Sequence, residues 1–175
     1  MNNLLRVVYV SKSTTPINDI DRGVHKDIGR ILMQSRKNNP KYQIGGVLYF
    51  SNNYFFQCLE GEKKAVISLL QKIAKDPRHM DVQTISVKYT NKRLFEDWSM
   101  KYVALQDNVT RLLNKNGMKS FNPYNFNDDM IKKMLKLFTN EVDTTSRSDQ
   151  KYSENDSNKS TTGFFSRLFN KSKAA

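Results

Sequence analysis

The sequence predicts an α+β domain in which a five-stranded sheet carries helices on both faces. Strand-like and helix-like segments follow one another as β-α-β-β-α-β-β over residues 4–104, which is the ferredoxin-like plan with one added strand. Two strands carry apolar residues on both faces, so both faces of the sheet need cover. Two amphipathic segments after residue 104 can supply the second layer.

The first strand and the first helix are predicted from their apolar patterns. Residues 4–11 form an apolar strand, and Thr14-Thr15-Pro16 marks the turn that follows. Residues 19–37 predict a helix that ends at Asn38-Asn39-Pro40. Its inward face has members three and four residues apart: Ile20, Val24, Ile28, Ile31, Leu32 and Ser35.

A β-hairpin comes next, with strands at 43–50 and 54–60 joined by Ser51-Asn52-Asn53. Both strands are apolar almost throughout, and Gln57 interrupts the second. An amide among aromatic side chains is costly unless it is hydrogen-bonded. Gln57 therefore needs a partner, which is either a core side chain or a ligand.

The remaining elements follow from helical and strand periodicity. Residues 62–75 predict a helix that Asp76-Pro77 stops, and 82–89 predict a strand. Residues 94–98 form a turn or short helix, and 100–104 form a last short strand. Two helices, at 107–116 and 127–139, are expected to pack on the sheet face opposite the first two helices.

We expect three parts in the chain: a domain at 1–104, a helical pair at 105–139 and a tail at 140–175. Residues 140–162 are polar and are expected to be disordered. Residues 164–171 can place four apolar side chains on one helical face with basic residues opposite. This end is a sticky disordered terminus, a docking segment for a partner, or a weak anchor on anionic lipid.

Composition limits the function classes. The net charge is +12, but the excess is spread, with 23 Lys and Arg against 12 Asp and Glu before residue 140 and no basic cluster. Specific nucleic-acid binding is therefore not favoured, although a basic binding module stays an alternative. Cys58 is the only cysteine, and neither a secretion signal nor a membrane-spanning run is present. We expect a cytoplasmic protein.

The residues offer little support for an enzyme. The two histidines, His25 and His79, have no nucleophile elbow near them, and one cysteine gives no metal-ligand spacing. No glycine-rich phosphate loop opens a helix. An acylphosphatase-like hydrolase on the same architecture is the enzymatic alternative, but Lys12-Ser13-Thr14-Thr15 lacks the glycine that its phosphate loop needs.

A slot between the first two helices is the predicted site. Tyr9 and Gln57 lie on strands expected to be adjacent and parallel, so their side chains can meet on the slot floor. Polar residues end the two helices beside it: Ser35, Asn38 and Asn39 on the first, and Arg78 and His79 on the second. Amide, phenol and guanidinium groups around an apolar slot suit a heteroaromatic ring with several carbonyls and nitrogens.

Several motifs occur in a characteristic order. They are Arg6-Val7-Val8-Tyr9-Val10-Ser11, Asn38-Asn39, Gly46-Val47-Leu48-Tyr49, Phe55-Phe56-Gln57-Cys58-Leu59-Glu60-Gly61, Asp76-Pro77-Arg78-His79 and Phe95-Glu96-Asp97-Trp98-Ser99-Met100. Over residues 4–104 the chain resembles the BLUF family of blue-light sensors that use FAD. The segment between Tyr9 and Asn39 is longer than in that family, with the extra residues placed around 14–21.

The resemblance implies roles for individual residues. Gln57 would bond to N5 and the C4 carbonyl of the flavin, and Tyr9 would bond to Gln57. Asn39 would bind the polar edge of the ring, and Arg78 the side near its C2 carbonyl. The other implied cofactor-binding residues are Ile31, Ser35, Asn38, Lys72 and His79. Taken alone, Tyr9 with Gln57 would more often be an ordinary satisfied core pair, and the ordered motifs reverse that preference.

The resemblance also implies a mechanism without enzymatic catalysis. Blue light would lead Tyr9 to donate an electron and then a proton, and Gln57 would rearrange. Trp98 and Met100 on the last strand would shift and pass the change to the C-terminal helices. Output would go through a light-dependent protein partner, such as a transcriptional regulator, or through a homo-oligomer.

Overall fold

The computed structural model describes residues 4–15, 26–97 and 99–140, and all structural statements below refer to these ranges. The expectations for Trp98, for residues 141–162 and for the segment 164–171 lie outside the described residues, as does the predicted helix start at Asp19.

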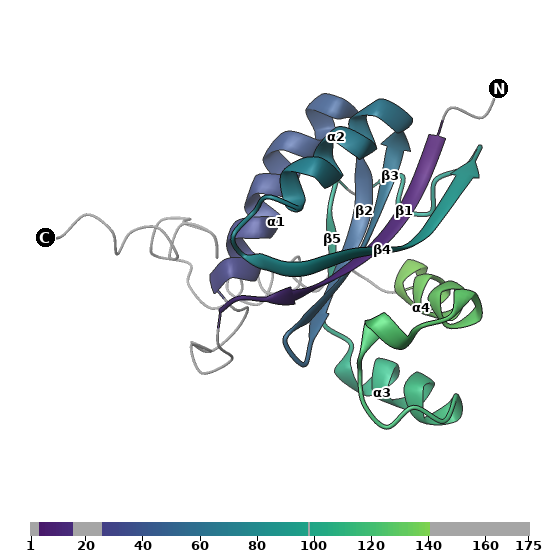
Figure 1. Cartoon of the computed structure of the whole chain (residues 1–175). Coiled ribbons are helices and arrows are strands. Elements are labelled where there is room, and N and C mark those ends of the chain that lie inside the picture. Colours follow the sequence, from purple (N-terminus) through teal and green to yellow (C-terminus); the bar gives the residue numbers. More distant parts are fainter. Residues whose placement is uncertain (1–3, 16–25, 98, 141–175) are drawn as a thin grey trace, which may run out of the picture.

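Eleven elements form an α+β fold that matches the predicted order (Figure 1). The strands are β1 Leu4–Ser13, β2 Gly45–Ser51, β3 Tyr54–Glu62, β4 His79–Thr90 and β5 Lys101–Val103. The helices are α1 Lys26–Asn38, α2 Lys63–Ile73, α3 Gln106–Lys115 and α4 Asp128–Thr139, with short 3₁₀ helices η2 Asn39–Tyr42 and η3 Pro123–Asn125. The strands form one sheet in the order β4-β1-β3-β2-β5.

The direction of one strand pair differs from the prediction. β1 and β3 are neighbours, as expected, but they run antiparallel, with Tyr9 directly opposite Gln57. The expectation of a parallel pair is wrong because the α1 crossover makes β1 and β2 parallel, and the hairpin then returns β3 between them in the opposite direction. The contact between Tyr9 and Gln57 survives, since antiparallel register places the two residues face to face.

The β2–β3 hairpin has a local explanation in its sequence. Asn52 and Asn53 have φ values of 50° and 66°, the left-handed pair that a two-residue type I′ turn needs. Gly46 lies so close to the next strand that an added Cβ would be 2.1 Å from the carbonyl oxygen of Cys58. Only glycine fits there, which holds β2 and β3 in tight register.

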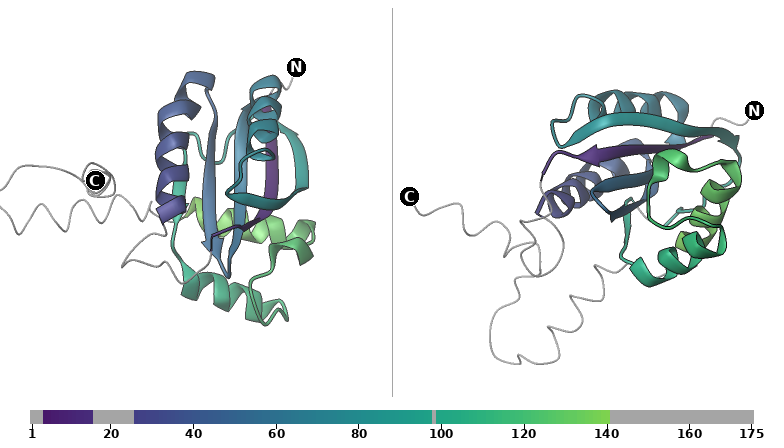
Figure 2. Two further views of the ribbon diagram at one scale, coloured as in Figure 1. Left: turned by 60° about the vertical axis from the view of Figure 1, so that its left-hand side comes forward. Right: turned by 60° about the horizontal axis from the view of Figure 1, so that its bottom comes forward.

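Both faces of the sheet are buried, which confirms the predicted two-sided cover. Figures 1 and 2 show α1 and α2 on one face and α3 and α4 on the other. Alternate residues of β1 enter the two cores, with Val7 and Tyr9 toward α1 and α2, and Val8 and Val10 toward α3 and α4. The helical pair after residue 104 therefore shares a core with the sheet.

β1 and β4 extend further than predicted, to Ser13 and back to His79, because the two strands pair with each other along these extra residues. His79 Nδ1 lies 2.8 Å from the hydroxyl oxygen of Ser11 in this stretch. The imidazole is 8% exposed and contacts the ring of Phe55 at a centroid distance of 4.6 Å. Burial lowers the pKa of His79 to about 4 from an ordinary 6.5, so the ring is neutral in the folded protein at neutral pH.

The buried His79 predicts a pH dependence of stability. Because its folded pKa lies below its unfolded value, the unfolded chain binds the additional proton between pH 6.5 and pH 4. The contribution is complete above pH 6.5 and is lost as the pH falls toward 4, a decrease of about 3 kcal/mol in the free energy of unfolding. Urea unfolding at several pH values should show this slope, and His79→Gln should remove it. An unchanged slope in the variant would contradict the assignment.

Candidate functional site

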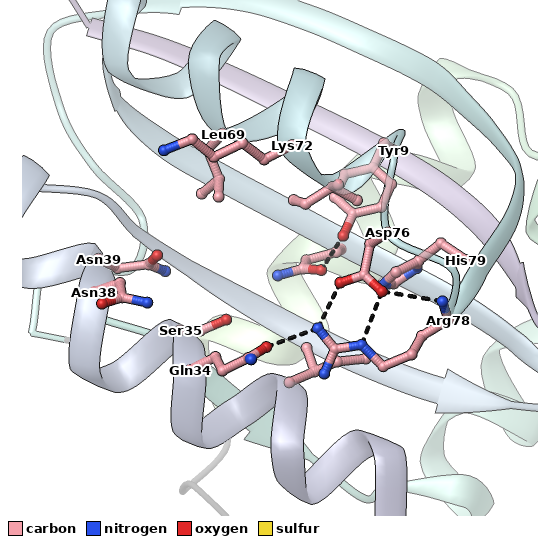
Figure 3. Close-up of a pocket in the computed structure, with 13 residues that line it drawn as sticks. Tyr9, Gln34, Ser35, Asn38, Asn39, Leu69, Lys72, Asp76, Arg78 and His79 are labelled. Atoms are coloured by element: carbon pink, nitrogen blue, oxygen red, sulfur yellow. Dashed lines mark hydrogen bonds and ion pairs between the residues drawn. The ribbon is translucent and has the colours of Figure 1, made fainter.

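A cavity of about 250 Å³ lies between α1 and α2 above the sheet (Figure 3). This volume is close to the lower end of the ~300–1,000 Å³ usual for small-molecule pockets. All of the sequence-predicted binding residues line it, together with four that were not predicted. The lining is Tyr9, Ile31, Gln34, Ser35, Asn38, Asn39, Gln57, Leu69, Lys72, Ile73, Asp76, Arg78 and His79.

The floor of the cavity is the cross-strand pair of Tyr9 and Gln57. The Tyr9 hydroxyl donates a hydrogen bond to Gln57 Oε1, and both side chains are buried. Burial raises the pKa of Tyr9 far above its ordinary value of 10, so the side chain is a neutral phenol across the physiological range. The Gln57 side-chain oxygen therefore has the hydrogen-bond partner that the sequence analysis required.

The amide nitrogen of Gln57 has a weaker partner. Nε2 donates to Met100 Sδ at 3.3 Å, and a thioether sulfur is a poor hydrogen-bond acceptor. Gln57 is 2% exposed, so water does not compensate for the weak bond. An oxygen or ring nitrogen of a ligand in the cavity would be a better acceptor for this N–H than the sulfur.

Asn39 joins the cavity wall to the segment that leads into β5. It is buried at the start of η2, and its Nδ2 donates to the carbonyl oxygen of Ser99 at 2.7 Å. Arg36 on the preceding turn donates from Nε to the carbonyl oxygen of Met100 at 3.1 Å. The C-terminal end of α1 and η2 therefore hold the backbone of residues 99–100 directly.

Arg78 is fixed by residues that the sequence analysis did not assign. Its Nε donates to Asp76 Oδ1 at 2.9 Å and its Nη2 to Gln34 Oε1 at 2.7 Å, as Figure 3 shows. The hydrogen bonds from Arg78 hold the pKa of Asp76 below its ordinary value. Arg78 Nη2 also donates to Asp76 Oδ2 at 2.5 Å, so the ion pair is bidentate. The motif Asp76-Pro77-Arg78-His79 contained the signal, because an acid two residues before an arginine can form such a pair. Gln34 is an exposed residue of α1 that lies outside the predicted inward face, and no sequence motif marked it.

Other cavity residues offer charge and donors. Within the described residues Arg78 donates hydrogen bonds from Nε and Nη2 and none from Nη1, which leaves the two N–H groups of Nη1 for a ligand. The Nζ atom of Lys72 on α2 is 5.7 Å from the ring centroid of Tyr42. Asn38 places an amide at the opposite side of the cavity (Figure 3). Ile31, Leu69 and Ile73 add apolar walls.

This donor set fits a flat heteroaromatic ring with carbonyl oxygens and an anionic extension. The ring would lie between apolar side chains, its carbonyls would accept from amide and guanidinium N–H groups, and Lys72 and Arg78 would face negative charge. Over the described ranges no cluster of His, Cys, Asp and Glu could hold a metal ion. The same part of the chain has no helix long and apolar enough to span a membrane.

Comparison with known sequences gives a family match over the same part of the chain. Residues 4–101 match the family described as "BLUF: Sensors of blue-light using FAD". The photoactivated adenylate cyclase subunit beta of Euglena longa is 31% identical over 100 residues, which cover 57% of this chain and 11% of that protein. The blue light- and temperature-regulated antirepressor BluF of Escherichia coli is 27% identical over 100 residues, covering 55% and 25%. The chain thus spans about a tenth of the cyclase subunit.

Solved structures extend the similarity to the C-terminal helices. The structures described as BlsA in its ground state and its photo-activated state have TM-scores of 0.74 and 0.73 and are each 33% identical to this chain. Each alignment covers 81% of this chain, and it covers 91% and 98% of the two BlsA chains respectively. Because the family match includes more than half of the chain and the cavity has a donor set for a flavin, we conclude that the protein belongs to the BLUF family of blue-light sensors that use FAD.

Proposed function

We propose that light changes the hydrogen bonding of Gln57 beside a non-covalently held FAD, and that the change leaves the domain through protein contacts. The observation that carries this proposal is the buried hydrogen bond from Tyr9 to Gln57 on the cavity floor. A phenol and an amide isolated from water have few alternative hydrogen-bond partners. A change in one of their hydrogen bonds therefore forces a change in the remaining bonds of the same network.

Different cavity residues would contact different parts of the flavin. Gln57 and Asn39 would meet the polar edge of the ring, and Arg78, held in place by Asp76 and Gln34, would offer Nη1 near the C2 carbonyl. Ile31 and Ser35 on α1 would line the ring. Asn38, Lys72 and His79 are the other residues proposed to contact the cofactor, with the Lys72 cation suited to its phosphates.

The bound flavin would absorb blue light and become a strong acceptor for an electron. Tyr9 is the proposed donor because it is a phenol on the cavity floor. Its proton has a defined first acceptor, Gln57 Oε1, along the existing hydrogen bond. High burial disfavours a separated phenolate, so Tyr9 would release electron and proton in close sequence and recover both as the network returns to the dark state.

Gln57 has the properties of a two-state element. In one arrangement its oxygen accepts from Tyr9 and its nitrogen donates to Met100. Because the Met100 bond is weak, rotating the amide loses little on that side, provided that a new acceptor is present in the cavity. A difference of a few kcal/mol between two such arrangements is sufficient for a switch.

Three consecutive residues, Ser99, Met100 and Lys101, form the proposed route out of the site. Ser99 is bonded to Asn39 and Met100 to Gln57, so both touch the cavity wall or floor. Lys101 is 2% exposed, and its Nζ donates to the carbonyl oxygen of Phe138 in the last turn of α4 at 2.7 Å. A cation at a helix C-terminus is stabilised by the free carbonyls there, so β5 and α4 are coupled through a buried charge.

This route assigns different tasks to the parts of the chain. Residues 1–104 would carry the chromophore, 105–139 would receive the signal, and 140–175 would stay available to a partner. We propose a non-enzymatic output through a second protein or a homo-oligomer in the cytoplasm. The exposed Val87 and Tyr89 on edge strand β4 support self-association, and the buried free thiol of Cys58 suits a reducing compartment.

The assignment of Tyr9 and Gln57 predicts the behaviour of two variants. Tyr9→Phe and Gln57→Leu should each purify with FAD, because most of the cavity contacts remain. Neither should show the reversible red shift of flavin absorption that blue light produces in the unchanged protein. Absorption spectra before and after a short blue pulse provide the test. A normal photocycle in either variant would refute the proposed mechanism.

Lys101→Met should separate the photochemistry from the output. The variant removes the buried link to α4 and leaves the cavity lining unchanged, so the flavin red shift should persist. Hydrogen exchange of residues 128–139 should differ between dark and light in the unchanged protein and should lose that difference in Lys101→Met. Lys133→Met is the matched control, because Lys133 lies on α4 itself and bonds to Asn116 and Asp129 and not to β5. Retained light-dependent exchange in Lys101→Met would exclude this route.

A further inference from the structure

A second cleft, of about 310 Å³, lies on the sheet face away from the flavin cavity, between α4 and strands β1 and β4. We call it the α4 groove. Its apolar lining comprises the exposed Leu94 and the core residues Ile131 and Leu135, which are 2% and 7% exposed. The Leu94 side chain is 40% exposed although its backbone N–H is bonded to the buried Glu60 carboxylate at 2.8 Å. An exposed leucine on a fixed backbone is a preformed apolar contact point.

The rim of the α4 groove is positively charged on both sides. Arg6 and Lys88 lie opposite each other in the β1–β4 register, and Lys132 and Lys136 lie one turn apart on α4. Glu60 pairs with Arg6, and Asp128 is 3.6 Å from Lys88. Lys132 and Lys136 form no ion pair with any described residue. The uncompensated positive charge therefore lies on the α4 wall, and it favours an anionic occupant.

We propose that the α4 groove binds an acidic amphipathic helix of a partner protein. Apolar side chains three and four residues apart on such a helix would contact Leu94, Ile131 and Leu135. Its flanking carboxylates would lie beside Lys132 and Lys136, because the sheet cations Arg6 and Lys88 already pair with Glu60 and Asp128. Two cations one helical turn apart match two acids at the same spacing better than one small carboxylate, which favours a polypeptide with several acids.

Charge also discriminates against two occupants that this chain could supply. The apolar segment 164–171 carries Arg167 and Lys171, with Lys173 just beyond it, so it would bring more positive charge to a positive rim. A second copy is equally unsuitable through its described helices, because α1, α2, α3 and α4 each contain more Lys and Arg than Asp and Glu. A foreign acidic helix is the complementary occupant.

The position of the α4 groove would make binding of this partner depend on light. Leu135, Lys136 and Thr139 line the groove, and the intervening Phe138 carbonyl is the acceptor for Lys101. Movement of β5 would therefore change the groove wall. This light dependence rests on the proposed function, whereas binding in the dark depends only on the groove.

A fluorescently labelled synthetic helix of about 18 residues, with leucines at helical spacing and glutamates on both flanks, is the probe. Anisotropy titrations use the full chain with its FAD bound. The unchanged protein should bind this helix and should not bind a version with lysine in place of glutamate. Lys132→Glu combined with Lys136→Glu should weaken binding at least tenfold, and Leu94→Ser should weaken it about tenfold.

Lys64→Glu combined with Lys75→Glu is the matched control, because Lys64 on α2 and Lys75 in the turn after α2 are both exposed on the other side of the sheet and the change in net charge is the same. This control should bind as the unchanged protein does. Equal weakening by both double variants, or equal binding of a scrambled acidic peptide, would overturn the proposal by showing charge attraction without a groove. If the unchanged protein fails to bind the acidic helix but shows a normal flavin red shift, the groove proposal is wrong and the photochemical proposal stands. If it binds the helix in the groove but shows no red shift, the photochemical proposal is wrong and the groove proposal stands.

Discussion

The hydrogen bond between Tyr9 and Gln57 is the interaction on which the rest of the structure depends. It places two polar side chains in a core from which water is excluded, where an unpaired group is expensive. The antiparallel register of β1 and β3, the tight packing at Gly46 and the aromatic hairpin all fix the two side chains opposite each other. The fold thus holds the phenol and the amide in one geometry, which a ligand in the cavity can perturb.

The sheet connects its two faces through a short strand. β5 contains only three residues, but the strip from Ser99 to Lys101 bonds to the cavity on one side and to the end of α4 on the other. Because the Lys101 ammonium donates to the Phe138 carbonyl, a displacement of β5 would act on the C-terminal end of α4. The segment from Ser99 to Lys101 therefore connects the flavin cavity with the α4 groove, although the two lie on opposite faces of the sheet.

Most of the fold and most of the cavity lining could be predicted from the sequence, since local patterns specify local structure. Apolar periodicity placed the helices and strands, and the cavity residues from Tyr9 to His79 follow from ordered motifs. The strand direction was mispredicted because adjacency alone does not define it; the crossover and the hairpin together do. Gln34 and Lys101 were missed because each acts through a partner distant in sequence, and only tertiary packing brings such groups together.

Infrared difference spectroscopy tests the central claim most directly. The protein is prepared with ¹³C in the side-chain amide of glutamine, and spectra are recorded in the dark and after blue light. A rearranged Gln57 predicts a difference band that shifts with the label and is absent from labelled Gln57→Leu. A light-minus-dark spectrum without any label-sensitive band, obtained while the flavin red shift is intact, would contradict the assignment of Gln57 as the switch.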